Sequence, residues 1–266
     1  MNTHKLKSIC TLILAILCFG TIANAQDLNQ YTSETFIKGK DTMNYRVLLP
    51  ENFDSTKTYP VLFFLHGSGE RGNDNQAQLI NGARVFLKRA YRKDFPSIVI
   101  FPQCPKDGWW SNTQIIADST GKRQFIFQKG GKPSAAMHAL LALVGKYTKK
   151  HFINKKQIYV GGLSMGGMGT YELLRRKPKM FAAAFAICGG DDVENVSRYK
   201  KIPLWIFHGA KDTVVDPQFS KNIADKLTRV GKEVKYTVYA AAEHNSWDAA
   251  LAEPELFPWL FSHIKN

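Results

Sequence analysis

A serine in a tight, glycine-rich turn is the strongest chemical signal in this sequence. Ser164 is the central residue of Gly162-Leu163-Ser164-Met165-Gly166, which follows a strand-like apolar run and precedes the helix-like residues 168–176. The spacing G-x-S-x-G between a strand and a helix is typical of a turn that exposes a serine hydroxyl above a sheet edge. Such a turn strains the backbone, and the helix N-terminus beside it favours negative charge. We therefore predict a nucleophilic Ser164 rather than an ordinary glycine turn.

A serine nucleophile needs a base and a group that orients the base. Where this turn is used, the chain order is serine, then acid, then histidine. Asp212 follows the strand-like run PLWIF, and His244 follows the strand-like run VKYTVY. The carboxyl ends of parallel strands share one edge of a sheet, so Ser164, Asp212 and His244 can converge there although they are far apart in the sequence.

Other acids and histidines fit these roles less well. Asp216 comes later in the loop of Asp212, and two further aspartates follow the preceding strand, a position that holds the acid in some enzymes with this turn: Asp191 and Asp192. We expect surface or packing roles for three histidines: His138, His151 and His263. His208 ends a strand. We expect it to be structural and to hold the loop that contains Asp212 and Asp216, which we call the acid loop.

The oxyanion that forms in acyl transfer needs donors, usually two backbone N–H groups. We expect one of them from Met165, the residue after the serine. The second is expected from the loop after the run VLFFL, which reads His66-Gly67-Ser68-Gly69-Glu70-Arg71-Gly72. Glycines let a loop turn an N–H inward, and Ser68 is the expected donor with Gly69 as the alternative. A plain glycine turn is the competing interpretation of this loop.

Strand-like and helix-like segments alternate along the chain. Seven apolar runs predict strands: Asn44–Leu49, Val61–Leu65, Ile98–Phe101, Gln157–Gly161, Phe181–Ile187, Pro203–Phe207 and Val234–Tyr239. Four segments predict helices: Ala77–Tyr91, Ser134–Lys149, Met165–Arg176 and Pro217–Val230. Residues 31–38 and 43–49 predict an N-terminal hairpin. The alternation indicates an α/β fold, with a mostly parallel sheet covered by helices on both faces.

Residues 26–266 contain no repeat or linker, so we expect a single catalytic domain there. Residues 105–132 contain two tryptophans and no clean hydrophobic period. A loop of that length inside a compact domain is usually functional or mobile. We expect it to be an insertion that shapes the pocket.

The first 25 residues have the pattern of a cleavable secretory signal. Lys5 and Lys7 precede the apolar run Ile9–Phe19, and Ala23-Asn24-Ala25 has the small residues of a cleavage site. The run is shorter than the roughly 20 residues that span a bilayer, and no later stretch resembles a membrane span. We expect cleavage after Ala25 and a protein that is periplasmic or secreted.

Composition and charge limit the remaining classes. With 44% apolar residues and 4 Cys, the chain is neither disordered nor a cysteine-stapled miniprotein. The formal net charge of +14 is compatible with a merely basic surface. The more specific interpretation is attraction to acidic polysaccharide or to anionic envelope lipid. No nucleic-acid partner is expected, because the lysines are dispersed without an aromatic-interleaved stripe.

Motifs along the whole chain after the signal resemble the α/β-hydrolase superfamily. They are HGSGERG, FPQCP followed by two tryptophans, GLSMGGMGTY, HGAKD and EHNSW. Within the superfamily, the sequence resembles secreted bacterial esterases near the feruloyl and acetyl-xylan esterases and the polyhydroxybutyrate-depolymerase-like group, also described as prolyl-oligopeptidase-like hydrolases or phospholipase/carboxylesterases. The resemblance implies an α/β-hydrolase fold with eight strands. One departure is that Glu70 and Arg71 follow Gly69 where many of these relatives have a glycine pair.

The strand order implied by this resemblance bears on the two cysteines outside the signal. It separates the strands before Cys104 and Cys188 by three positions, or about 14 Å at about 4.8 Å per step. A disulfide requires Cα atoms within about 7 Å. We therefore predict that both thiols are free.

Three other features of the site have open or weaker interpretations. Trp109 and Trp110 either plug the insertion onto the domain or form a wall of the acyl or sugar pocket, since aromatic faces stack on such rings. Glu70 and Arg71 are expected to pair and brace the oxyanion loop. Gly69 is a further candidate for substrate contact.

The expected activity is that of a serine esterase that works through an acyl-enzyme on small-molecule or polysaccharide-linked esters, for example acetyl or feruloyl esters. One alternative is a serine peptidase of the prolyl-oligopeptidase type, although the sequence contains no propeller or gating domain. Another is a non-catalytic binding protein on the same fold, although no triad member is missing. We expect no cofactor or metal, because no Glu–His cluster has zinc-ligand spacing and no glycine loop carries a phosphate-binding lysine.

Overall fold

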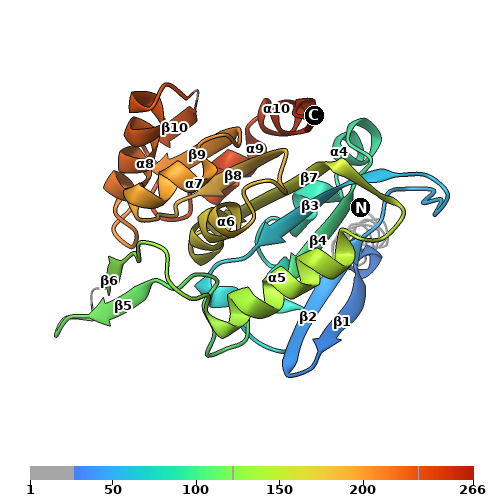
Figure 1. Cartoon of the computed structure of the whole chain (residues 1–266), viewed down its shortest axis with the longest axis horizontal. Coiled ribbons are helices and arrows are strands. Elements are labelled where there is room, and N and C mark those ends of the chain that lie inside the picture. The colour runs from blue at the N-terminus through green and yellow to red at the C-terminus, as the bar shows by residue number, and fades with distance from the viewer. Residues whose placement is uncertain (1–26, 122, 233) are drawn as a thin grey trace, which may run out of the picture.

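The computed structural model describes residues 27–121, 123–232 and 234–266 of the chain (Figure 1). The predicted secretory signal and its cleavage site after Ala25 lie outside the described residues. Within the described part of the chain, no helix is both long enough and apolar enough to cross a membrane.

Eight strands form one sheet, in the order β1-β2-β4-β3-β7-β8-β9-β10. Their bounds are β1 Thr32–Lys38, β2 Asp41–Leu48, β3 Tyr59–Leu65, β4 Ile98–Pro102, β7 Ile153–Leu163, β8 Ala183–Ile187, β9 Leu204–Gly209 and β10 Lys235–Tyr239. The strand β2 is antiparallel to both of its neighbours, β1 and β4, and all other neighbours are parallel. The predicted α/β-hydrolase fold is confirmed, with a mixed sheet that is mostly parallel.

Helices cover both faces of the sheet because its central strands are apolar on both sides (Figure 1). On β3, Val61, Phe63 and Leu65 point into one core, whereas Leu62 and Phe64 point into the other, as the alternation of a strand requires. The first core is covered by α5 Ala135–Tyr147, α6 Met165–Arg176, α7 Val196–Tyr199 and α8 Pro217–Arg229. The second is covered by α3 Ala83–Phe86, α4 Arg89–Asp94, α9 Trp247–Ala252 and α10 Leu256–Ser262.

The predicted continuous helix over Ala77–Tyr91 is wrong. The segment is divided into a 3-10 turn, η3 Ala77–Leu79, and the short helices α3 and α4. Gly82 interrupts it with a φ of 90°, a conformation that side chains disfavour. A Cβ at Gly82 would lie 3.0 Å from the ring of Phe64, so the chain breaks where its backbone packs directly against the sheet. The other 3-10 turns are η1 Asp27–Gln30, η2 Ser68–Glu70 and η4 Val193–Asn195.

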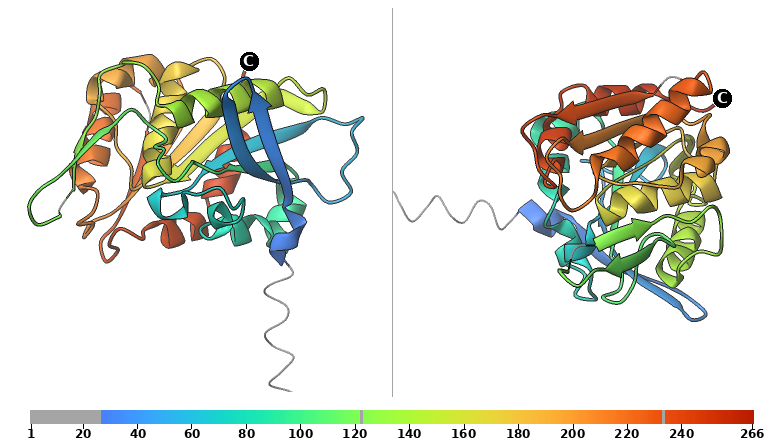
Figure 2. Two further views of the ribbon diagram at one scale, coloured as in Figure 1. Left: turned by 90° about the horizontal axis from the view of Figure 1, so that it is seen from below. Right: turned by 90° about the vertical axis from the view of Figure 1, so that its left-hand side faces the viewer.

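Residues 105–132 contain a two-stranded sheet of their own, β5 Gln114–Ala117 and β6 Arg123–Ile126. This hairpin projects from the body of the molecule (Figure 1, Figure 2). Of its strand residues only Phe125 is buried, so the hairpin has almost no hydrophobic pattern by which the sequence could predict it.

Partly buried hydrogen bonds and a buried ion pair fasten the base of this insertion to the domain. The backbone N–H of Asn112 donates to Glu172 on α6 at 2.8 Å, and Arg175 donates to the carbonyl oxygen of Gly130 at 2.7 Å. Glu172 and Arg175 also form an ion pair at 2.9 Å. The two ends of the insertion are therefore held on one helix, whereas the hairpin itself extends outward.

Cys104 and Cys188 are both buried and free, as predicted. Cys104 belongs to the core on one face of the sheet and Cys188 to the core on the other. Burial is the main cause that raises the pKa of Cys104 to about 12. The thiol of Cys104 therefore remains protonated in the folded protein.

Candidate active site

Ser164 lies between β7 and α6 with φ 54° and ψ −119°, a conformation that is rare for a residue with a side chain. Two glycines allow the chain to turn this tightly. A Cβ at Gly162 would lie 2.5 Å from the carbonyl oxygen of Gly166, and a Cβ at Gly166 would overlap the carbonyl oxygen of Leu65. The predicted nucleophile therefore occupies a strained turn that is packed against the end of β3.

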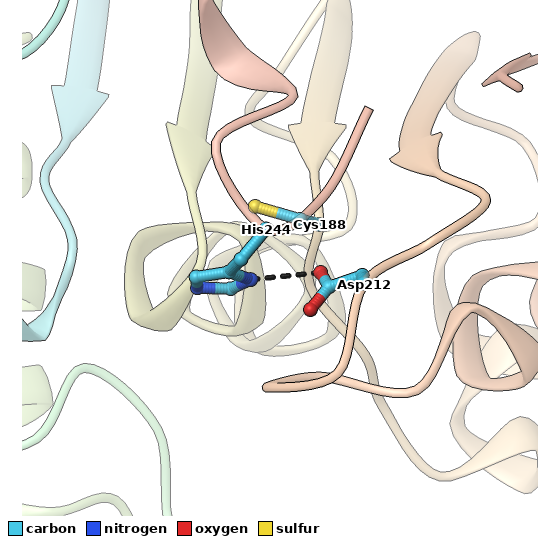
Figure 3. A group of neighbouring side chains, drawn as sticks. All are labelled: Cys188, Asp212 and His244. Atoms are coloured by element: carbon cyan, nitrogen blue, oxygen red, sulfur yellow. Dashed lines mark hydrogen bonds and ion pairs between the residues drawn. The ribbon is translucent and has the colours of Figure 1, made fainter. Parts of the chain in front are cut away.

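The structure brings the three predicted triad side chains together. Ser164 Oγ lies 2.9 Å from His244 Nε2, and His244 Nδ1 lies 2.7 Å from Asp212 Oδ2. Asp212 follows β9 and His244 follows β10, so both reach the serine from the carboxyl ends of parallel strands. Figure 3 shows the hydrogen bond between His244 and Asp212. Because a carboxylate only accepts hydrogen bonds, Nδ1 carries the hydrogen and Nε2 is available to accept the serine proton.

Asp212 is held as a carboxylate by its surroundings. The backbone N–H groups of Val214 and Val215 donate to Oδ1 at 2.8 and 3.0 Å, and His208 Nε2 lies 3.1 Å from Oδ2. Burial raises the pKa of Asp212, but hydrogen bonds from His208, from His244 and from the backbone outweigh this effect and hold the pKa well below its ordinary value. The result is a buried anion that can orient the His244 imidazole and stabilise its charged form.

His208 is fully buried and contacts the acid loop, in agreement with its predicted structural role. Its Nε2 also lies 2.9 Å from the carbonyl oxygen of Val215, and its Nδ1 lies 2.7 Å from Ser220 Oγ. Since a carbonyl oxygen can only accept, Nε2 must carry the hydrogen. His208 is therefore a donor that positions Asp212.

The alternative acids have other partners. Asp216 accepts a backbone N–H at the start of α8, and Asp192 accepts one at the start of η4. Asp191 is buried and accepts a hydrogen bond from Asn195 at 2.8 Å. None of the three is bonded to His244 in the described structure.

The alternative histidines contact other parts of the described structure. His138 is exposed beside Asp41, with Nδ1 and a carboxylate oxygen 3.1 Å apart. His151 is exposed beside Phe152. His263 lines a surface hollow together with residues that precede β9 and β10, at the sheet edge opposite the triad.

The two predicted oxyanion donors begin helical turns. Ser68 is the first residue of η2 and Met165 the first of α6, so neither N–H has an acceptor within its own turn. Gly67 brings the first loop close to the nucleophile, because a Cβ at Gly67 would lie 3.6 Å from Ser164 Cβ. The alternative donor, Gly69, is exposed, and a Cβ there would meet nothing within 4 Å.

The predicted pairing of Glu70 with Arg71 is wrong. Glu70 instead accepts a hydrogen bond from Asn81 at 2.9 Å. Arg71 donates to the carbonyl oxygens of Ser68 at 2.9 Å and Gly108 at 3.2 Å. Arg71 therefore braces the oxyanion loop through backbone groups and connects it to the insertion.

The prediction that Trp110 contacts substrate is also wrong. Trp110 is completely buried, and its indole N–H donates to the carbonyl oxygen of His66 at 3.1 Å. Trp109 is half-buried, with the guanidinium of Arg71 5.3 Å from its ring centre. Trp109 also packs against the small apolar cluster that contains Met168. Trp110 thus plugs the insertion onto the domain, which is the structural alternative of the two interpretations.

A cavity of about 870 Å³ opens between the hairpin and the acid loop. Half of its lining comes from the insertion and half from the acid loop and α8: Ile116, Asp118, Arg123, Gln124, Phe125, Asp212, Thr213, Val214, Asp216 and Phe219. The lining combines aromatic rings with charged groups of both signs. Neither Trp109 nor Trp110 belongs to it.

The sequence model of the phospholipase/carboxylesterase family matches residues 53–257. The chain belongs to this family. Membership confirms the predicted superfamily and the predicted class of ester hydrolases. The matched residues include most strands of the sheet and all three predicted triad positions.

The chain covers different shares of the length of its individual relatives. A bifunctional acetylxylan esterase/xylanase from Neocallimastix patriciarum is 34% identical over 132 residues, which are 44% of this chain and 19% of that protein. A probable feruloyl esterase C from Aspergillus terreus (strain NIH 2624 / FGSC A1156) is 24% identical over 212 residues, or 79% of this chain and 70% of that one. The crystal structure of a thermostable esterase superposes with a TM-score of 0.80 at 33% identity, covering 90% of this chain and 64% of that chain.

Two residues beside the predicted triad were not expected from the sequence, and no sequence pattern indicates the first of them. Cys188 follows β8 with a φ of 42° and lies next to the Asp212–His244 pair (Figure 3). Trp247 presents its ring edge-on to the His244 ring, with centroids 5.6 Å apart. An aromatic residue shortly after the histidine, in EHNSW, is the one feature that could have indicated Trp247.

The group formed by Cys188, Asp212 and His244 is also where a metal ion would be sought. One ligand atom from each lies within 4.8 Å of the others. Burial is the main cause that raises the pKa of the Cys188 thiol, and the nearby Asp212 charge adds to it. Metals bind the thiolate form, so this protonated thiol, beside two side chains already bonded to each other, is a poor ligand.

Proposed function

We propose that this chain is a serine esterase that hydrolyses carboxylic esters through Ser164, His244 and Asp212. The observation that carries the proposal is the continuous chain of hydrogen bonds from Ser164 Oγ to His244 Nε2 and from His244 Nδ1 to Asp212 Oδ2, at 2.9 and 2.7 Å. These distances are within the reach required for proton transfer from a nucleophile to its base. The backbone strain at Ser164 adds support, because such strain is concentrated at functional sites.

The reaction follows from this arrangement. His244 Nε2 takes the proton of Ser164 as Oγ attacks the ester carbonyl carbon, and the backbone N–H groups of Met165 and Ser68 stabilise the oxyanion. His244 then gives its proton to the leaving alcohol, and the acyl group remains on Ser164. Water attacks this acyl-enzyme with His244 again as the base, which releases the acid and restores the serine. Asp212 stays ionised throughout and stabilises the imidazolium.

We propose a carbohydrate-linked acetyl or feruloyl ester as the substrate class, delivered to the cavity beside the acid loop. Support comes from the two curated relatives, whose names describe an acetylxylan esterase and a probable feruloyl esterase. The cavity offers the aromatic rings of Phe125 and Phe219 together with the polar groups of Arg123 and Gln124. Such rings pack against phenolic or sugar rings, and the polar groups can bind hydroxyls. We also propose that residues 26–266 form one catalytic domain, exported after removal of residues 1–25.

One purified sample tested on a panel of substrates decides between an esterase and a peptidase, and between the classes of ester. The panel contains p-nitrophenyl acetate, methyl ferulate, acetylated xylan, a long-chain acyl ester and a prolyl peptide. We expect hydrolysis of the short and aromatic esters, no cleavage of the peptide, and loss of all ester hydrolysis in Ser164→Ala. Full activity of Ser164→Ala overturns the proposed function, and cleavage of the peptide in preference to every ester assigns the site to a peptidase.

A further inference from the structure

Three surface hollows adjoin one another at the sheet edge opposite Ser164. Their volumes are about 170, 390 and 520 Å³. The first and second share Lys201 and Pro203, and the second and third share Lys179 and Lys265, so the three form one continuous surface. They lie over the beginnings of β7, β8, β9 and β10, whereas the triad loops follow the ends of strands in the same parallel set.

This surface is strongly basic. The hollows are lined by ten cationic residues, which we call the basic belt: Lys149, Lys155, Arg176, Lys177, Lys179, Lys200, Lys201, Lys232, Lys235 and Lys265. No aspartate or glutamate is among the described lining residues. Glu233, which lies between two of the lysines in the sequence, is outside the described residues.

Few of these cations are neutralised within the described chain. Arg176 pairs with Glu172 at 2.7 Å. Lys265 donates to the carbonyl oxygen of Lys179 at 3.1 Å, and the Lys235 ammonium lies 3.7 Å from the ring centre of Trp205. Among the residues described, no carboxylate forms an ion pair with any lysine of the basic belt. Like charges gathered in this way repel one another, and an anionic partner relieves the repulsion.

Exposed apolar side chains accompany the cations. Ile264 lines the middle hollow and is 59% exposed. Val230, which is 40% exposed, follows the last residue of α8 and lies two residues before Lys232 in the sequence. A hydrated acidic polysaccharide offers such side chains little, whereas a lipid surface offers anionic headgroups with apolar chains beneath them. The combination of cations and exposed isoleucine therefore favours lipid.

We propose that the basic belt docks this enzyme on an anionic lipid surface, with the Ser164 edge facing away from the lipid. The strand β9 has six residues, so at about 3.3 Å per residue the two edges are roughly 20 Å apart. This separation exceeds the Debye length of about 8 Å at physiological salt. Charges in the basic belt therefore act on the lipid without disturbing the triad, and a docked molecule keeps its active site open to solution.

The test is sedimentation of the full protein with vesicles of phosphatidylglycerol and phosphatidylcholine in equal parts, or of phosphatidylcholine alone. We expect binding only to the anionic vesicles, and release at high salt. The variant Lys177→Glu/Lys179→Glu/Lys201→Glu is expected to weaken binding at least about 100-fold, with hydrolysis of p-nitrophenyl acetate unchanged. The matched control Lys40→Glu/Lys88→Glu/Lys93→Glu makes the same change in net charge outside the hollows and is expected to bind like the wild type.

Equal weakening by the two triple variants overturns the proposal, because net charge alone would then explain the binding. Binding of soluble polygalacturonate without binding of the anionic vesicles also overturns it, in favour of an acidic polysaccharide. If the basic-belt variant loses ester hydrolysis and so fails to fold, Ile264→Ser replaces it. We expect this exposed substitution to weaken vesicle binding several-fold, and unchanged binding contradicts the lipid assignment.

Discussion

At the scale of single residues, the site depends on how one carboxylate is shared. Asp212 Oδ2 faces both His208 and His244, at 3.1 and 2.7 Å, while Oδ1 is occupied by backbone N–H groups. This arrangement fixes the direction in which Asp212 presents its charge to the base. His208 thus acts on the reaction through Asp212, as a positioning residue.

Replacing His208 tests this role. In His208→Ala the acid loses a buried donor, and we expect kcat for p-nitrophenyl acetate to fall about tenfold with little change in KM, together with a loss of about 1–3 kcal/mol of stability. His208→Gln retains a donor and is expected to recover part of kcat. Steady-state kinetics and urea unfolding of both variants provide the measurement. An unchanged kcat in a folded His208→Ala would contradict the positioning role.

At the scale of elements, the turn between β7 and α6 depends on the absence of side chains. Gly166 packs against the carbonyl oxygen of Leu65 so closely that no Cβ fits, and Gly162 is in the same situation against Gly166. The strand β3 therefore fixes the height of Ser164 above the sheet. The glycines of the motif are explained by backbone packing rather than by contact with substrate.

A pair of glycine substitutions separates packing from catalysis. Gly166→Ala forces backbone atoms apart, and we expect a loss of at least about 3 kcal/mol in stability, with activity lost. Gly69→Ala adds a methyl group where nothing lies within 4 Å, so its stability is expected to change by less than about 0.5 kcal/mol. Thermal unfolding compares the two variants. Equal stability of Gly166→Ala and the wild type would show that the turn is looser than described.

The hairpin formed by β5 and β6 is the element that we connect to substrate choice. Phe125 is 7% exposed and belongs to both the hairpin and the cavity lining. Its neighbour Ile126 is 37% exposed and does not line the cavity. We expect Phe125→Ala to raise KM for methyl ferulate about tenfold while leaving kcat for p-nitrophenyl acetate within about threefold. Ile126→Ala is the matched control. An equal rise in KM in Ile126→Ala would contradict a role of the cavity in substrate choice.

At the scale of the whole molecule, the sheet separates two kinds of surface. Its carboxyl edge holds the triad, and its opposite edge holds the basic belt. The body between them is stabilised by two apolar cores that contain few charges. Asp191 is a carboxyl group buried within this body, and we expect it to couple global stability to pH.

Burial is the main cause that raises the pKa of Asp191 to about 7, although Asn195 and Arg175 partly offset it. An unfolded aspartate has a pKa of about 3.9. Between these values the unfolded chain binds fewer protons than the folded one, so this group makes stability fall as pH rises. We expect Asp191→Asn to be more stable than the wild type at pH 8 by up to about 4 kcal/mol, with a smaller difference near pH 4. Urea unfolding at both pH values measures this, and a pH-independent difference would contradict it.

The sequence predicts most of the fold for physical reasons that can be named. Central strands such as β3 and β7 are largely buried on both faces, so their apolar runs stand out, and α5 has clear helical spacing behind a start signal at Ser134. The broken helix at Gly82 and the exposed β5–β6 hairpin lack such patterns, because their conformation is set by tertiary contacts or by solvent. The triad residues are predictable from chain order, since parallel strands bring their ends together. The sequence does not predict the contacts of Trp110, Glu70 and Arg71, because partners far away in the sequence decide where those side chains point.

The proposed reaction requires Ser164 Oγ to be the nucleophile that attacks the ester carbonyl carbon. This role is tested by reaction of the native enzyme with a fluorophosphonate, followed by digestion and mass spectrometry of the peptides. We predict a single adduct on Ser164, formed in parallel with loss of esterase activity and absent in His244→Ala. An inactivated enzyme whose adduct lies on another residue would contradict this account.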